Sequence, residues 1–301
     1  MITRRRFIAI SAALAALPAQ SRAGTPGPTW TGQALGARAS IRLDHPDAAA
    51  IARRVTAEIA RLEGILSLYR SDSALARLNR DGHLAAPPFE LLDCLGLAGA
   101  VHAASGGRFD PTVQGLWAVW AEAGGVAPAA AALDKARAAT GWQGVRLAPG
   151  AITLRPGMAL TLNGIGQGYV ADRIAALLAA EGLTNILVDT GEFRALGTRP
   201  GGGDWPVRLE AGPRITLADR ALATSAPLGT SFDAAGRLGH ILDPRTGAPV
   251  AGPWRSVSIS APEAALADAL STAACLCENR AEVEALLTRF PQARLEALQA
   301  A

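Results

Sequence analysis

Helical and strand-like segments alternate irregularly along this 301-residue chain, and that irregularity limits the folds open to it. Residues 47–68 carry an apolar residue every three or four positions, which predicts an amphipathic helix. Short apolar runs such as 185–188 and 257–260 predict strands. A regular βαβ array would need strands and helices in strict turn. The order therefore predicts an α+β fold, a single mixed α/β domain over residues 24–301.

The remaining elements are predicted from the same patterns. Further strands are expected at 30–43, 145–147, 151–154, 159–162, 207–210 and 221–225. Further helices are expected at 74–79, 89–105, 169–181, 263–277 and 281–289, and a broken helix over 113–139. Trp117 and Trp120 in that broken helix are expected to pack in the core.

The first 23 residues have the features of an export signal. Arg4, Arg5 and Arg6 precede an apolar run over 8–17 that is too short to cross a bilayer. Two arginines followed by x-Phe-aliphatic are the twin-arginine form, and small residues up to Ala23 suit a signal peptidase. The first cysteine is Cys94, so no lipid-anchor cysteine follows the run. We expect a periplasmic protein that is soluble and carries no lipid anchor.

The excess of basic over acidic residues in the chain comes from this signal. The chain has 29 Lys and Arg against 26 Asp and Glu, and half of its residues are hydrophobic. Removing four arginines with residues 1–23 leaves 25 basic against 26 acidic residues. Such a balance gives no basic surface for nucleic acid, and the apolar content excludes disorder as the main state.

Cysteine and histidine contribute little to a predicted site. The three cysteines, Cys94, Cys275 and Cys277, are an odd number without metal-ligand spacing, so we expect buried thiols. The four histidines are scattered, which argues against a zinc site.

Two turns are candidates for binding an anionic ligand. His240, Asp243 and Arg245 fall within six residues on a Pro/Gly turn, where dense charge suits such a ligand, although a solvated surface turn is the alternative. Gly164 and Gly168 belong to a glycine-rich turn that leads into a helix and lets backbone N–H groups reach a phosphate. Its spacing is not that of a Rossmann fingerprint, and a tight packing turn is the alternative.

The predicted helix at 263–277 carries a candidate metal site. Asp268 and Thr272 are four residues apart and therefore share one face. A carboxylate and a hydroxyl, with carbonyls and water, are the hard oxygen ligands that Mg²⁺ prefers. The alternative is that Asp268 caps a neighbouring turn, since a buried carboxylate needs a partner.

Taken together, these motifs resemble one family. They are LG at 35–36, LSLY at 66–69, DS at 72–73, GRFDPTV at 107–113, NGIGQGY at 163–169 with Asp172, GE at 191–192, ATS at 223–225, HILDPRTG at 240–247 and ADALSTA at 267–273. The chain resembles the ApbE family of flavin transferases, which use FAD and Mg²⁺ to attach FMN to a Thr or Ser of a target protein. The resemblance covers nearly all of residues 24–301.

The resemblance implies a role for each matching residue. Metal coordination falls to Asp268, Thr272 and the backbone carbonyl of Gly164. The positions implied to bind FAD are Leu35, Tyr69 over the flavin side, Asp110, Thr112, Thr161, and Gln167 and His240 near the ribityl or pyrophosphate region. The target hydroxyl attacks the FMN phosphorus and AMP leaves, while His240 or Asp243 orients the hydroxyl or accepts its proton.

The chain departs from the family pattern at some of these positions. Thr161 and Gln167 stand where many members have Asp and Lys, and the single lysine, Lys135, is no obvious substitute. Leu35 begins a Leu-Gly-Ala motif where Met-Gly-Thr is frequent. The form of the 163–169 motif, with a twin-arginine signal, resembles the NosX-type branch, which is associated with flavinylating a membrane protein that supports nitrous oxide reduction. The implied partner is therefore an acceptor domain with an exposed Thr or Ser.

Two other functions are compatible with the same residues. A FAD pyrophosphatase would use water in place of the target hydroxyl and release FMN and AMP without an acceptor. A non-catalytic periplasmic FAD-binding or assembly protein would hold FAD without turnover. The missing charges at Thr161 and Gln167 favour this last function.

Overall fold

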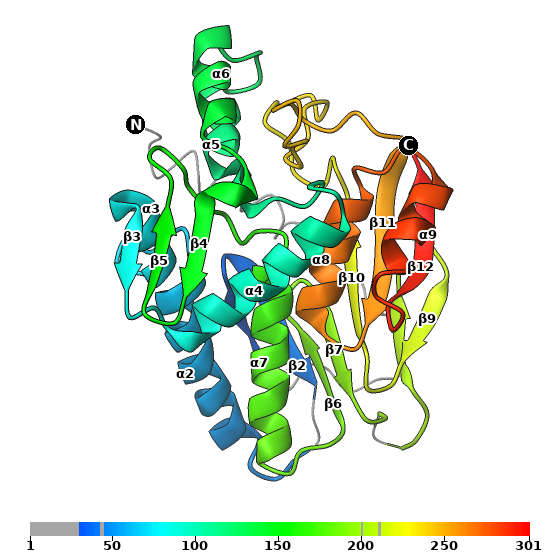
Figure 1. The fold of residues 1–301 in the computed structure, drawn as a ribbon. Helices are drawn as coiled ribbons and strands as arrows, with labels where there is room; N and C mark the ends of the chain where they lie inside the picture. Colours follow the sequence, from blue (N-terminus) through cyan, green and yellow to red (C-terminus); the bar gives the residue numbers. More distant parts are fainter. Residues whose placement is uncertain (1–29, 43–44, 200, 210–211) are drawn as a thin grey trace.

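Within the residues that the structure describes, seven strands form one antiparallel sheet, and helices pack on one of its faces (Figure 1). The computed structural model describes residues 30–42, 45–199, 201–209 and 212–301. The predicted export signal lies outside these residues. The order in the sheet is β1-β2-β6-β7-β10-β11-β12. Its strands are β1 (Trp30–Ala34), β2 (Ala37–Arg42), β6 (Ile186–Asp189), β7 (Phe193–Leu196), β10 (Ala221–Ser225), β11 (Trp254–Ala261) and β12 (Arg294–Ala300).

Two smaller sheets and the helices complete the described fold. The first small sheet has the order β3-β5-β4, and the second is a hairpin of β8 and β9. Their strands are β3 (His83–Ala85), β4 (Val145–Ala148), β5 (Ala151–Leu154), β8 (Trp205–Arg208) and β9 (Arg214–Leu217). The α-helices are α2 (Ala48–Leu66), α3 (Ala74–Asp81), α4 (Phe89–Ala104), α5 (Gln114–Ala123), α6 (Ala130–Ala138), α7 (Gly166–Ala180), α8 (Ala264–Ala274) and α9 (Arg280–Leu287). Short 3-10 turns lie at Pro111–Val113 and Trp142–Gly144.

Helices α2, α4, α7 and α8 form one layer, and α8 is its most buried member. The predicted apolar stripe of α2, which includes Ile51, Val55 and Leu62, faces inward. Helix α8 packs on α4 and α7 and also on β10 and β11 (Figure 1). A side chain at Gly168 would place its Cβ only 2.3 Å from the Ala264 carbonyl oxygen, so this glycine allows α7 and α8 to approach closely. The packing holds α8 against the sheet.

The opposite face of the sheet is partly covered by the β8–β9 hairpin. Alternation along β6 sends Leu187 to this face, whereas Ile186 and Val188 pack in the helical core. Leu187 and Leu222 form a cluster there with Trp205 of the hairpin. The apolar stretch of this sheet face is therefore buried by the hairpin.

The structure confirms the α+β class and the single domain, and most predicted elements are present. The segment predicted as one strand at 30–43 forms the hairpin β1–β2 over its described part, 30–42, because Leu35 (φ 49°) and Gly36 (φ 86°) reverse the chain. Residues 159–162 form no strand. The Asn79 side chain donates to the Leu160 carbonyl at 2.8 Å and accepts from the Leu160 N–H at 2.7 Å, which replaces the hydrogen bonds of a neighbouring strand. Strands β3, β7, β9 and β12 were not predicted.

Several predictions about the core are confirmed. All three cysteines lie within the described residues, are buried and form no disulfide. Trp117 and Trp120 are buried and pack against Phe232.

No described helix has the length and apolar character that a membrane span requires.

Candidate active site

A larger and a smaller cavity meet beside α8 and together form an elongated site. The larger has a volume of about 430 Å³ and the smaller about 70 Å³. Both are lined by Trp117, Asn163, Gln167 and His240, so these residues mark where the cavities join. Asp268 lines the larger cavity, and the loops before α7 and between β10 and β11 close it.

Asp268 is a buried carboxylate with an unsatisfied oxygen. Its Oδ2 has no hydrogen-bond partner among the described residues, and the residue is 4% exposed. Burial raises the pKa of Asp268 to about 8, although the backbone N–H of Gly168 donates to the carboxylate and acts in the opposite direction. Buried acceptors without a partner are costly, so this oxygen is expected to meet a ligand.

The other two predicted metal ligands lie beside Asp268. Thr272 lines the larger cavity on the same face of α8, and its Oγ1 lies 3.1 Å from the Ser225 hydroxyl. Gly164 is against Thr272, because a Cβ built on Gly164 would lie 3.0 Å from Thr272 Oγ1. A carboxylate, a hydroxyl and the backbone of a glycine loop are hard oxygen donors, which fit Mg²⁺. The described residues contain no cluster of three or more His, Cys, Asp or Glu side chains that could hold a metal ion, so the site has a single acidic side chain with a hydroxyl and backbone oxygens.

Glu192 is a second buried carboxylate in the larger cavity, and the sequence analysis gave it no role. Its Oε2 accepts a 3.2 Å hydrogen bond from the Thr224 backbone N–H. Burial, then the negative charges of Asp268 and Asp189, hold the pKa of Glu192 well above its usual range. The available signals were the Gly191-Glu192 match to the family and the position of Glu192 in the short loop between β6 and β7, since loops often carry site residues. Burial and mutual repulsion favour the protonated form of both acids, and a cation bound beside them would favour the ionised form instead.

His240 lies at the junction of the two cavities. Its Nδ1 is 3.0 Å from the Thr230 carbonyl oxygen, which can only accept, so Nδ1 carries the proton. Burial lowers the pKa of His240, and hydrogen bonds to the carbonyls of Thr230 and Pro227 offset part of this effect. The ring is therefore neutral near pH 7 and keeps Nε2 as a proton acceptor.

Asp243, the other predicted base, lines neither cavity. It accepts hydrogen bonds from the backbone N–H of Arg245 at 2.9 Å and from its Nη2 at 2.7 Å. Burial raises the pKa of Asp243, but these bonds outweigh burial and leave it below its usual value. The turn is also held by Trp120, whose Nε1 donates to the Gly247 carbonyl at 2.8 Å. The charges of this turn, predicted to bind an anion, are thus paired with each other.

Two of the predicted FAD-binding residues, of which Tyr69 was predicted on the flavin side, line the smaller cavity. Leu35 and Tyr69 both lie there, with Gly36 beside the Tyr69 ring. The Leu35 N–H donates to Glu63 Oε1 at 3.0 Å, which fixes the turn that presents the Leu35 side chain. An apolar and aromatic slot of this kind suits a planar ring system.

Most other predicted FAD contacts line the larger cavity. Asp110 and Thr161 lie there, and Gln167 lines both cavities. Thr112 lies behind the wall, where its Oγ1 donates to Asp110 Oδ1 at 2.6 Å and accepts from the Gly141 N–H at 2.7 Å. These bonds occupy the Thr112 hydroxyl, so Thr112 supports Asp110 instead of facing a ligand.

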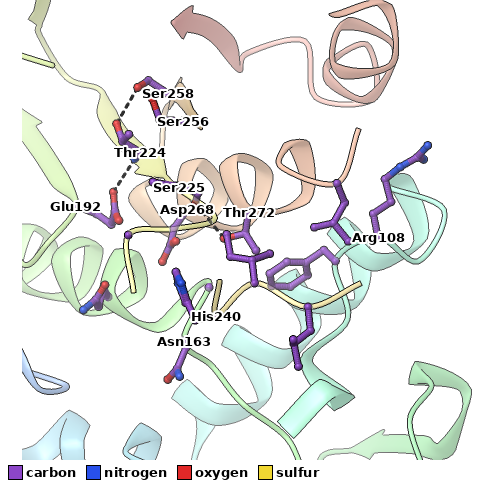
Figure 2. A pocket seen from close by; sticks show the side chains of 18 of the residues that line it. Arg108, Asn163, Glu192, Thr224, Ser225, His240, Ser256, Ser258, Asp268 and Thr272 are labelled. Carbon is purple, nitrogen blue, oxygen red and sulfur yellow. Dashed lines mark hydrogen bonds between the residues drawn. The ribbon is translucent and has the colours of Figure 1, made fainter. Parts of the chain in front are cut away.

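Figure 2 shows how the side chains surround the larger cavity. Asp268 is central, with His240 and Asn163 to one side and Thr224, Ser256 and Ser258 to the other. Seven lining residues had no predicted role, although the first two lie in motifs that carry the family resemblance: Asn163, Glu192, Arg208, Arg255, Ser256, Ser258 and Gln299. They come from strands and loops that are far apart in the sequence and are brought together by the fold.

Comparison with known proteins gives consistent matches. The sequence matches the ApbE family over residues 35–298. A curated FAD:protein FMN transferase of Treponema pallidum is 33% identical over 260 residues, which cover 76% of this chain and 71% of that protein. Another of the same name, from Salmonella typhimurium, is 28% identical over 269 residues, covering 82% and 75%. The crystal structure of Pseudomonas stutzeri flavinyl transferase ApbE in its apo form superposes with a TM-score of 0.77 at 27% identity, covering 90% of this chain and 93% of that one.

Proposed function

Because this chain belongs to the ApbE family, we propose that it is an FAD:protein FMN transferase, the activity for which its curated relatives are named. The observation that carries the proposal is the unpartnered Oδ2 of buried Asp268, in a cavity that joins an apolar slot at Tyr69. FAD combines a planar apolar ring system with a charged pyrophosphate. The two joined cavities offer a place for each part.

Asp268, Thr272 and the backbone carbonyl of Gly164 would hold Mg²⁺. Their proximity in the larger cavity and the unsatisfied carboxylate oxygen support this set. Mg²⁺ bound there would neutralise charge on the pyrophosphate oxygens during phosphoryl transfer. Glu192 lines the same cavity and is buried, and a cation bound there would favour its ionised form.

The transferred group passes from FAD to a hydroxyl of the acceptor. The Thr or Ser oxygen forms a bond to the phosphorus of the FMN half, the bond from that phosphorus to the AMP oxygen breaks, and AMP leaves. The hydroxyl proton goes to His240 Nε2, since the neutral ring has its Nδ1 proton committed to Thr230. Asp243 is not used as the base, because it is paired with Arg245 outside the cavities. The product is an FMN phosphoester on the acceptor.

The site of action would be the periplasm. The twin-arginine pattern of residues 1–23 supports export, and the absence of a cysteine after the apolar run supports a mature protein without a lipid anchor. The resemblance to the NosX-type branch favours a membrane-bound electron-transfer protein as the acceptor. Its accepting domain would present an exposed Thr or Ser.

The test is a transfer assay with the chain from Gly24 onward. The protein is incubated with FAD, Mg²⁺ and a candidate acceptor domain, while AMP is followed by chromatography and the acceptor by intact mass. An acceptor that gains one FMN as AMP appears supports the transferase. FMN and AMP released from FAD without a change in acceptor mass, for every acceptor tried, would indicate a pyrophosphatase. FAD that binds and stays intact would indicate a binding or assembly protein.

A further inference from the structure

Two serine hydroxyls beside the candidate metal ligands have no role in the proposed function. Ser225 is the last residue of β10, and Ser271 directly precedes Thr272 on α8. Ser225 lines the larger cavity, whereas Ser271 is fully buried and does not line it. Figure 2 shows the Ser225 side chain beside Thr272. The two serines come from distant parts of the chain and meet because α8 packs on β10.

The direction of the hydrogen bonds between these hydroxyls follows from one partner that can only accept. Ser271 Oγ lies 3.0 Å from the backbone carbonyl oxygen of Asp268, so Ser271 donates its single hydroxyl hydrogen there. Ser271 Oγ can then only accept from Ser225, whose Oγ lies 2.6 Å away. Ser225 is therefore the donor in the bond between the two serines.

The same reasoning sets the direction of the Thr272 hydroxyl. Ser225 gives its only hydroxyl hydrogen to Ser271, so it must accept in its 3.1 Å contact with Thr272 Oγ1. The hydroxyl hydrogen of Thr272 therefore points to Ser225. Among the described residues Thr272 Oγ1 has no other hydrogen bond, so both of its lone pairs are left without a donor.

This direction suits a hydroxyl that binds a cation. A cation is bound through the lone pairs of an oxygen and is repelled by a hydroxyl hydrogen that points at it. Thr272 Oγ1 and the unpartnered Oδ2 of Asp268 are both available acceptors on one helix. In the reverse direction, a hydrogen from Ser225 would occupy one lone pair of Thr272 and leave the Thr272 hydrogen free to turn toward the cation.

We propose that Ser225 and Ser271 are positioning residues for the cation, because their hydroxyls form a one-way chain that holds the Thr272 hydrogen away from it. Neither serine is itself a ligand. Ser225 acts through Thr272, and Ser271 acts only through Ser225. This inference rests on the magnesium site of the proposed function and adds two residues that determine how tightly the site binds its cation.

Two single variants and their combination test the chain. Ser225→Ala removes the acceptor of the Thr272 hydrogen. Ser271→Ala removes the acceptor of the Ser225 hydrogen, which can then turn to Thr272 Oγ1 and reverse that bond. The matched control is Thr288→Ala, since Thr288 Oγ1 also donates to a carbonyl three residues earlier, at 2.7 Å, and lines neither cavity.

The probe is Mn²⁺, whose free concentration is measured by electron paramagnetic resonance with the purified protein, with and without FAD. We expect each serine variant to bind Mn²⁺ about tenfold more weakly than the wild type, because loss of a group that orients a ligand has effects of this size. Thr288→Ala should stay within about twofold. Ser225→Thr keeps the hydroxyl and should restore the affinity to within about threefold of the wild type.

The double variant separates a chain from two independent contacts. Adding Ser271→Ala to Ser225→Ala should weaken Mn²⁺ binding no further, because Ser271 has no other route to Thr272. Additive losses, or an unchanged affinity in both single variants, would overturn the proposal. A loss in Ser225→Ala with none in Ser271→Ala would make Ser225 a ligand and overturn it too, as would a wild type that binds no Mn²⁺.

FMN transfer measured against Mg²⁺ concentration separates this inference from the proposed function. The serine variants should need about tenfold more Mg²⁺ for half of the maximal rate, while kcat at saturating Mg²⁺ stays within about threefold. If the wild type transfers FMN and the serine variants bind Mn²⁺ as it does, the transferase stands and the chain is wrong. If the variants bind Mn²⁺ more weakly but no acceptor gains FMN, the chain stands and the transferase is contradicted.

Discussion

The carboxylate of Asp172 on α7 accepts a 2.8 Å hydrogen bond from the backbone N–H of Ala264, the first residue of α8. The first of these bonds is to Oδ1, and Oδ2 accepts a second hydrogen bond from the Ala265 N–H at 2.9 Å. Arg194 Nε lies 3.3 Å from Oδ1. Helix α8 has no side-chain cap from its own N-cap residue, so Asp172 supplies the cap from a neighbouring helix. Because α8 carries Asp268, this contact positions the candidate metal site.

Replacing Asp172 with Ala should destabilise the fold. Two N–H groups at the start of α8 would lose their acceptor, which we expect to cost about 2 kcal/mol of unfolding free energy. Urea denaturation measures the change. Asp134→Ala, at an exposed ion pair on α6, is the control and should change stability by less than about 0.5 kcal/mol. Equal stability of the two variants would contradict the capping role.

Asp172 also predicts a pH dependence of stability. Burial raises its pKa to about 6 in the folded state, from an ordinary 3.8. The folded protein then holds the proton more tightly than the unfolded chain, so ionisation of this group lowers stability as pH rises between these values. The unfolding free energy of the wild type minus that of Asp172→Asn should fall by up to about 3 kcal/mol over this range and then level off. A difference that stays constant or rises would contradict the assignment.

The contact between α7 and α8 should not tolerate a methyl group. The Cβ of Gly168→Ala would lie 2.3 Å from the Ala264 carbonyl oxygen, so the two backbones must separate. We expect a loss of about 2 kcal/mol or more in unfolding free energy. Gly64→Ala and Gly96→Ala are matched controls, because each glycine is helical with no atom near the added Cβ, and alanine there should stabilise by about 0.5–1 kcal/mol. Similar effects at all three glycines would exclude the close contact as the cause.

Asp268→Asn should remove Mg²⁺ binding without unfolding the protein. The wild-type carboxylate is buried with an unpartnered oxygen, so a neutral side chain costs little in the absence of metal. Added Mg²⁺ should raise the Tm of the wild type and leave that of the variant unchanged, and transfer to an acceptor should be lost. A Tm increase of equal size in both proteins would show that the cation binds elsewhere.

Local features of the sequence were predicted well, whereas contacts between distant segments were not. Asp268 and Thr272 were predicted together because their proximity depends only on helical spacing. Asp110, at a turn, was also predicted in the pocket. Thr112 was predicted there too, but its hydroxyl accepts a hydrogen bond from the N–H of Gly141, which is far along the chain. Glu192 was marked only by the Gly191-Glu192 match to the family, and nothing in the local sequence predicts that it is buried beside Asp268. The two carboxyl groups come close only when the segment after β6 and helix α8 pack together in the fold.

Strand β12 shows how tertiary contacts override local preference. Its sequence, Arg294–Ala300, is rich in Leu, Ala, Glu and Gln, which favour helices. It is a strand because it pairs along β11, from Ser260↔Arg294 to Trp254↔Ala300. The strand has no clear apolar alternation in its sequence, because its residues are at most partly buried on either face. Gln299 of this strand, which lines the larger cavity, therefore had no predicted position.

Kinetic measurements on variants should distinguish the two predicted bases, His240 and Asp243. His240→Ala removes the acceptor at Nε2, so kcat should fall by about a hundredfold or more while FAD affinity is largely kept. Asp243→Asn is the matched control, since Asp243 lines neither cavity, and its kcat should stay within about fivefold of the wild type. Because burial lowers the pKa of His240 from 6.5, the wild-type rate should fall only as pH drops below that value. His240→Ala should lack this acidic limb. An acidic limb retained in His240→Ala but lost in Asp243→Asn would assign the proton transfer to Asp243 instead.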